Sequence, residues 1–200
     1  MDTFQSEESK RPLILEYLER AIETNRQELD RAFNGRPINA VAWLARNLME
    51  LQLWTEYCIA SEENTTNFRN DLFREMVHLI KIPPSVKDDE SVSVKLIREF
   101  RTEMIDIGKD AGFSDIDAGY IRLVDVAKQL NKSNWYLVCN KFFSKYAHTT
   151  AISIVIPEEF NVESRKSFYN FGIEYATEAL RLIGKFRGDL EAAPLTPNSS

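Results

Sequence analysis

The sequence predicts an all-α protein, a single-domain bundle of six to seven helices. Apolar side chains recur at helical spacing through most of the 200 residues, which places them on one face of each helix. Gly and Pro number only seven each, few for a protein of many strands and turns. A hydrophobic content of 44% is enough for the core of one domain. We therefore expect a bundle at residues 12–188, a disordered leader at 1–11 and a disordered tail at 189–200.

The first helix is expected to begin at Pro12, because proline is well tolerated in the first turn of a helix. Its apolar side chains fall on one face and its charged ones on the other. Gly35 and Pro37 are typical of a helix end, since glycine adopts the left-handed cap and proline cannot continue the helix. The first helix is therefore expected to end at residues 34–37.

Residues 39–60 predict the central helix of the bundle, because they are apolar almost all the way round. Gln52 and Glu56 fall on the same side of this helix and mark its expected exposed face. Ser61, with Asn64 three residues later, indicates the start of a third helix, which is expected to stop before Pro83.

The second half of the chain predicts four further segments of helical spacing after a long loop at residues 83–90. The fourth helix is expected to end at Gly112, and shorter helices follow at about 120–130 and 134–148. The β-branched stretch 149–156 has no partner strand, so we interpret it as a helix continuation or an irregular buried segment. A final helix is expected from residue 161 to about 187.

Composition narrows the classes of function. A net charge of -6 argues against a general nucleic-acid surface, which draws its affinity from Lys and Arg, although a local basic patch stays possible. Cys58 and Cys139 are the only cysteines and are expected to be free thiols in a reducing compartment. The chain has neither the apolar run of a signal peptide nor one of membrane-spanning length. We expect a cytoplasmic protein without a membrane partner.

Motifs of nucleotide, zinc and serine hydrolase sites are missing from the sequence: it has no Gly-rich phosphate loop, no Cys-x-x-Cys, no His-Glu-x-x-His and no Gly-x-Ser-x-Gly. A di-iron bundle needs two Glu-x-x-His pairs. Glu75 and His78 supply one, whereas His148 has Lys145 in place of the Glu. We therefore expect neither a metal site nor a cofactor.

The central helix carries a first candidate site. Arg46 and Glu50 are one turn apart and can form an ion pair, yet they lie nearly in line with Trp43 and Tyr57 rather than with the polar residues. One interpretation is a partly buried structural salt bridge. The other is the floor of a binding site for an anionic or polar ligand, formed by Arg46, Glu50, Asn47, Trp43, Tyr57 and Thr149.

A second candidate site lies near the end of the sixth helix. Lys141, Lys145 and His148 fall along one polar stripe, and Thr149 follows directly. The stripe is either a solvated helix face or a cluster that combines a base titrating near neutral pH with cations and hydroxyl donors. Such groups suit phosphate chemistry, and Arg46 would join them if the central helix turned it this way.

Two strings resemble a known family. ARNLMELQLWTEYCIAS (Ala45 to Ser61) and SKYAHTTA (Ser144 to Ala151) look like an uncharacterised family of all-helical bacterial proteins near the HEPN class of nucleotide-binding domains. The resemblance implies a HEPN-like bundle, often a homodimer, in a stress or phage-defence setting. In some relatives it implies metal-independent RNA cleavage by an Arg and a His with four to six residues between them. This sequence departs from that pattern, because Lys141 is the nearest substitute for the Arg before His148.

Three hypotheses follow. The first is a HEPN-like interaction or regulatory protein, forming a homo-oligomer with a possible RNA or protein partner. The second is a metal-independent ribonuclease in which His148 is the general acid or base and Lys145 and Lys141 stabilise phosphate charge. The third is a bundle that binds a small ligand at the Arg46 and Glu50 aromatic face.

Overall fold

The computed structural model describes residues 10–81, 85, 91–113, 116, 119–147 and 158–192, and only the backbone of 158–161 and 191–192. This part of the chain has no strand and forms seven α-helices, which confirms the predicted all-α bundle. They are α1 (Arg11–Gly35), α2 (Ile38–Ala60), α3 (Glu62–Leu79), α4 (Val92–Asp110), α5 (Leu123–Gln129), α6 (Ser133–Ala147) and α8 (Glu158–Ala192). The stretch 149–156 and almost all of the loop 83–90 lie outside the described residues.

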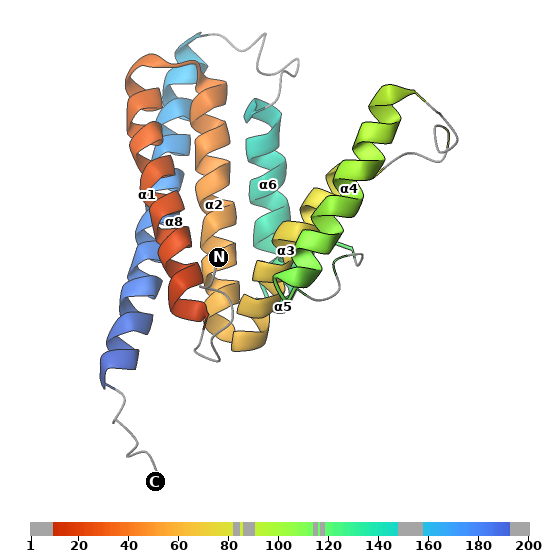
Figure 1. Cartoon of the computed structure of the whole chain (residues 1–200). Helices are drawn as coiled ribbons and strands as arrows, with labels where there is room; N and C mark the ends of the chain where they lie inside the picture. Colours follow the sequence, from red (N-terminus) through yellow and green to blue (C-terminus); the bar gives the residue numbers. More distant parts are fainter. Residues whose placement is uncertain are drawn as a thin grey trace.

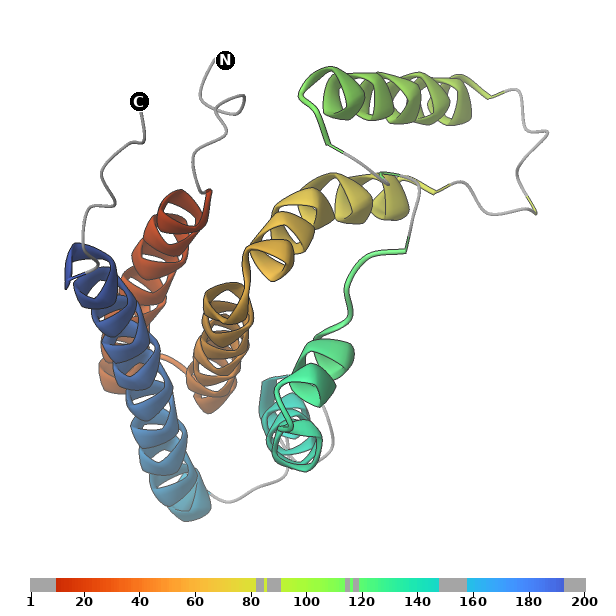
Figure 2. The ribbon, with the colours of Figure 1, turned by 90° about the horizontal axis from the view of Figure 1, so that it is seen from below.

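Helix α2 is the centre of the molecule. It packs against α1, α3, α5, α6 and α8, and its side chains are buried on most sides. Figure 1 shows α1, α2, α6 and α8 as the main bundle, with α4 standing apart. Figure 2 shows α3 leading away from the end of α2 to α4. The bundle is therefore a compact core with one side arm formed by α3 and α4.

A single extended residue, Ser61, joins α2 to α3. Its Oγ accepts a hydrogen bond from the backbone N–H of Asn64 at 3.0 Å, the N-terminal cap that the sequence predicted. Side chains in the first turn of α3 also reach back to the last turn of α2. The Asn64 Nδ2 donates to the carbonyl of Tyr57 and the Thr65 Oγ1 donates to that of Cys58, each at 2.9 Å. These contacts satisfy carbonyls that the end of a helix leaves without a partner.

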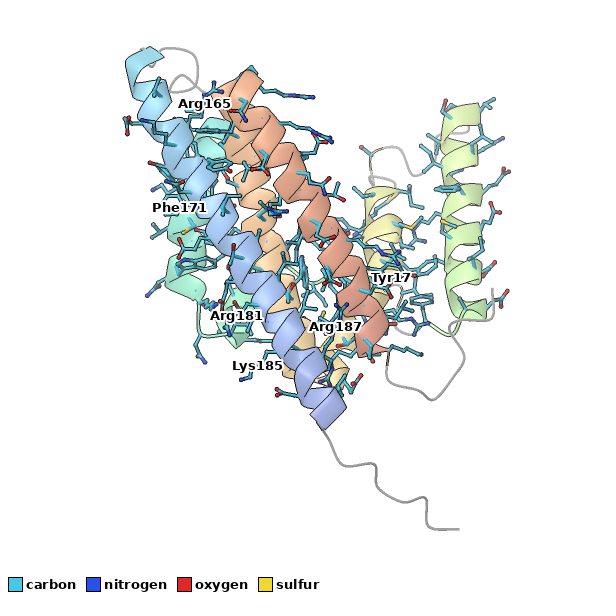
Figure 3. All side chains as sticks on the ribbon, turned by 90° about the vertical axis from the view of Figure 1, so that its left-hand side faces the viewer. Tyr17, Arg165, Phe171, Arg181, Lys185 and Arg187 are labelled. Carbon is cyan, nitrogen blue, oxygen red and sulfur yellow. The ribbon has the colours of Figure 1, made fainter. Side chains whose placement is uncertain are left out.

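Helix α8 packs closely on the rest of the bundle because Gly172 faces α1 and α2. A Cβ at Gly172 would lie 2.5 Å from Leu29 Cδ2 and 3.3 Å from Ala45 Cα, closer than packed atoms approach. Two arginines also tie α8 to α1 (Figure 3). Arg165 donates to the carbonyl of Phe33 at 3.2 Å, and Arg187 pairs with Glu19 at 2.6 Å.

The structure corrects three local predictions. Gln52 is only 6% exposed, so it does not lie on an exposed face, whereas Trp43 is 51% exposed. The predicted exposed face is missing because neighbouring helices cover α2 on several sides. Helix α5 begins at Leu123 and leaves Tyr120 outside it, and α8 continues to Ala192 rather than ending near Arg187.

Both cysteines are free thiols, as expected. Cys58 on α2 is 0% exposed, and burial raises the pKa of its thiol to about 12. Cys139 on α6 is half-buried. Within the described part of the chain, the helices are all too short or too polar to cross a membrane.

Candidate functional site

The expected ion pair on α2 is present. Arg46 Nε donates to Glu50 Oε1 at 2.9 Å, and the two side chains are 25% and 24% exposed. Burial raises the pKa of Glu50, and the charge and hydrogen bond of Arg46 only partly oppose this rise. The pair therefore fits the structural interpretation, a half-buried salt bridge whose two members satisfy each other within one turn.

A small hollow, here the Glu50 hollow, lies between α1 and α2 beside this pair. It has a volume of about 240 Å³ and is lined by Asn25, Asn47, Glu50, Leu51 and Trp54. The Asn47 Nδ2 donates to Asn25 Oδ1 at 3.4 Å. Small-molecule sites usually measure about 300–1,000 Å³. The hollow is therefore too small for most ligands, although it does bring together the predicted residues Asn47 and Glu50.

The other predicted residues of this site are not brought together around the hollow. Trp43 is largely exposed, and Tyr57 is 2% exposed with its ring in edge contact with Trp54 at a centroid distance of 5.9 Å. The charges of Glu50 and Arg46 also act on Tyr136 of α6, whose pKa is raised chiefly by burial. The ion pair therefore lies near the α6 side of α2.

The predicted catalytic stripe is only partly within the described structure. His148 and Thr149 lie outside the described residues, whereas Lys141 and Lys145 are exposed on α6. On a helical wheel these lysines are about 140° and 180° from Tyr136, the α6 residue whose pKa responds to Arg46. The described part of the chain therefore does not bring either lysine to Arg46.

A cavity that the sequence analysis did not predict, here the Gln52 cavity, opens between α2, the turn from α5 to α6, and α8. Its volume is about 1010 Å³. The lining residues combine amides, hydroxyls, charges of both signs and two aromatic rings: Gln52, Lys128, Asn131, Lys132, Ser133, Asn134, Trp135, Glu174, Tyr175, Thr177 and Glu178. Sequence reasoning did not single out any of them as a site residue.

Gln52 is the most buried polar group of this cavity. Its Nε2 donates to Glu56 Oε1 at 2.8 Å, and because a carboxylate only accepts, this bond fixes which end of the amide is which. The Oε1 atom of Gln52 is buried and accepts no hydrogen bond from the residues that the structure describes. Leaving such an acceptor unsatisfied costs about 1–3 kcal/mol.

Lys132 connects the turn before α6 to α2. Its Nζ lies 2.6 Å from the Glu56 carboxylate and 5.6 Å from the centroid of the Trp135 ring. The charge of Lys132 also helps to lower the pKa of Glu178, although the hydrogen bonds from Arg181 contribute most to that shift. Lys132 therefore joins the start of α6 to α2, two elements that are far apart in the sequence.

The start of α6 contributes Ser133, Asn134 and Trp135 to the cavity lining. The first backbone bond into this helix runs from the N–H of Tyr136 to the carbonyl of Lys132. The preceding N–H groups of Ser133, Asn134 and Trp135 come too early in the helix to find a carbonyl within it. Beside them, the rings of Trp135 and Tyr175 pack edge to face at 5.6 Å and form the apolar part of the wall.

The arrangement is suited to binding. It offers donors, acceptors and an aromatic surface at one opening, which is the usual composition of a small-molecule site. No known family model matches this chain, and no curated protein or solved structure matches it either.

Sequence reasoning missed this cavity for an identifiable reason. Lys132 falls in the predicted turn 131–133, and Glu56 is 76 residues away, so their contact has no local signal. The sequence did contain one local signal. The Asn-Lys-Ser turn predicts the start of a helix, where the first backbone N–H groups have no partner within the helix. In the structure, Asn131 of this turn has a positive φ of 58°.

Proposed function

We propose that the protein is a helical bundle that binds a small polar molecule in the Gln52 cavity. The observation that carries this proposal is the cavity itself, about 1010 Å³ in volume, where amide, hydroxyl, charged and aromatic side chains surround one opening. This proposal places ligand binding away from the Arg46 and Glu50 pair, where the hollow is small, at the face of α2 that borders the α5–α6 turn and α8.

The proposal is tested by a thermal-shift screen of polar metabolites, followed by titration calorimetry of those that raise the melting temperature. The Trp135→Ala and Gln52→Leu variants are expected to lose the shift, because both side chains line the cavity. Trp43→Ala is the matched control, since Trp43 is an exposed tryptophan of α2 that does not line it. Equal shifts in the three variants, or no shift with the whole panel, would overturn the proposal.

The resemblance supports a second proposal, a HEPN-like interaction or regulatory protein that forms a homodimer. The all-helical fold agrees with it, and α4 exposes the side chains of Val92, Leu96, Ile97 and Phe100, an apolar patch of the kind found at protein interfaces. Light scattering on wild type and Phe100→Glu tests it. A wild-type monomer would contradict the proposal.

The ribonuclease hypothesis is supported by the two exposed lysines of α6, Lys141 and Lys145, which precede His148 in the sequence. It requires RNA cleavage without added metal. The His148→Ala variant should lose that cleavage and keep its melting temperature. Cleavage that survives in this variant would exclude His148 as the general acid or base.

A further inference from the structure

We infer that two copies of this chain associate through α4 of one copy and α6 of the other, an acidic and apolar face against a basic and apolar face. This inference rests on the proposed homodimer and adds the two surfaces that meet. Each copy carries both faces, so a dimer with two-fold symmetry makes the same contact twice.

The outer face of α4, here the α4 face, combines exposed apolar side chains with carboxylates. Leu96 is 58% exposed and Phe100 is 46% exposed. On a helical wheel Leu96 lies about 20° from Glu103 and about 60° from Glu99, so apolar and acidic groups share one surface. A groove of about 550 Å³ runs along this surface. Among the described residues, its charged lining consists of one arginine and four exposed acidic side chains: Arg98, Glu99, Glu103, Asp106 and Asp110.

The outer face of α6, here the α6 face, carries the opposite charge. Val138 is 70% exposed and Leu137 is 52% exposed. Lys141 is exposed as well, about 60° from Val138 and about 40° from Leu137 on the helical wheel. Lys145, also exposed, follows one turn later. The α6 face therefore matches the α4 face in its apolar groups and complements it in charge, which is how specific protein surfaces select each other.

Each face also carries like charges one turn apart on its own helix. Glu99 precedes Glu103 by four residues, and Lys141 precedes Lys145 by the same interval. Like charges at this spacing destabilise a helix. Within the described part of the chain, Glu99, Glu103 and Lys141 form no ion pair that would offset this repulsion. Four residues span about 6 Å of either helix, so lysines of one face can lie opposite carboxylates of the other and relieve the repulsion on both.

The α4 face would reach α6 of its own copy only if α4 left α3. Ile105, which lies about 180° from Leu96 on the helical wheel, is buried together with Gly108. A Cβ at Gly108 would lie 3.1 Å from the Phe73 ring of α3, so the two helices are closely packed. Figure 2 shows α4 on the far side of α3 from α6. The occupant of the α4 face therefore comes from another molecule, and a second copy supplies the complementary charge.

The experiment is analytical ultracentrifugation of the full chain over a range of concentrations, with one variant in each face. Leu96→Glu and Val138→Glu are each expected to raise the dissociation constant of the dimer about tenfold or more, because each replaces an apolar contact by a charge that the partner repels or leaves unpaired. Leu190→Glu is the matched control, since Leu190 is an exposed leucine of α8 outside both faces. All three positions are exposed, so the melting temperatures should stay close to wild type.

A charge exchange tests the complementarity itself. Glu103→Lys and Lys141→Glu are each expected to weaken the dimer about fivefold, because like charges then meet across the contact. The two changes in one chain should restore association to within about twofold of wild type, since the faces have exchanged one charge and remain complementary. A double variant that is no tighter than either single variant would overturn the inference.

The other outcomes separate this inference from the proposed functions. A dimer that Leu96→Glu disrupts and Val138→Glu leaves intact would mean that α4 does not contact α6. A dimer unchanged in both variants would place the interface elsewhere. Either result overturns the inference and keeps the proposed homodimer, whereas a wild-type monomer at every concentration overturns both. Binding in the Gln52 cavity is a separate question, because neither face lines that cavity.

Discussion

The Arg46 and Gln52 regions of α2 are built from the same local unit, a polar side chain followed four residues later by a glutamate. Arg46 with Glu50 completes itself, since a cation and a carboxylate of one helix satisfy each other. Gln52 with Glu56 does not. The Nε2 atom of Gln52 donates to Glu56, whereas the Oε1 atom of Gln52 accepts no hydrogen bond from the described residues. Glu56 in turn takes its cation from Lys132. The self-contained pair therefore satisfies its own polar groups, and the incomplete one leaves a buried acceptor without a partner among the described residues.

The sharpest test of this contrast is Arg46→Leu. It is expected to lower the free energy of unfolding by about 2 kcal/mol, because Glu50 would keep a half-buried charge without its cation. Urea denaturation measures the change. The double variant Arg46→Leu with Glu50→Leu should regain most of the loss, since replacing both members by apolar side chains leaves no charge behind. A single variant as stable as wild type would show that the pair is not structural.

The Lys132→Met variant tests the Gln52 region by removing the cation that pairs with Glu56. It is expected to cost about 1 kcal/mol, because Glu56 would keep only its bond from Gln52. Lys128→Met is the control, since Lys128 is an exposed lysine of the same cavity and its loss should change stability by less than about 0.5 kcal/mol. Equal losses in the two variants would contradict the bridging role of Lys132.

Gln52→Leu should behave in the opposite way to Arg46→Leu. The variant loses one hydrogen bond to Glu56 and also removes the unsatisfied acceptor, so stability should stay within about 1 kcal/mol of wild type or rise. Thermal unfolding without ligand measures this. A loss as large as that of Arg46→Leu would mean that the Oε1 atom of Gln52 accepts a hydrogen bond in solution.

The two regions should also differ in their response to pH. Burial raises the pKa of Glu50, so its contribution to stability is complete below the unfolded pKa of about 4.3 and falls as the pH rises through the folded value. Arg181 lowers the pKa of Glu178, so that contribution is present above the unfolded pKa and is lost as the pH falls.

Glu50→Gln and Glu178→Gln test this difference in sign. Between about pH 4 and about pH 7, wild type should lose stability relative to Glu50→Gln and gain it relative to Glu178→Gln. Both changes should be small, the second especially, because Glu178 and Arg181 are solvated at the surface. Parallel trends in the two variants would contradict the assigned causes of the shifts.

The sequence predicted the features that depend only on residues close together in the chain. The end of α1 near Gly35, the cap at Ser61 and the Arg46 to Glu50 pair all depend on neighbours along the chain, and the structure has all three. The left-handed cap predicted at Gly35 is wrong, because Gly35 is the last helical residue, it has no positive φ, and the extended residue Arg36 ends the helix. The burial of Gln52 depends on which helices cover α2, and the Lys132 to Glu56 contact joins residues 76 apart. Such features are set by packing between helices, which periodicity alone does not reveal.

The two cysteines make the cavity convenient to observe. The Cys58 thiol is fully buried with its pKa raised to about 12, so at neutral pH it stays protonated and resists alkylation. Cys139 is the more accessible thiol, and it accepts a hydrogen bond from the Tyr175 hydroxyl at 3.7 Å, directly behind a residue of the cavity wall. A fluorophore attached at Cys139 would therefore report occupancy of the cavity in the natural sequence, without an engineered labelling position.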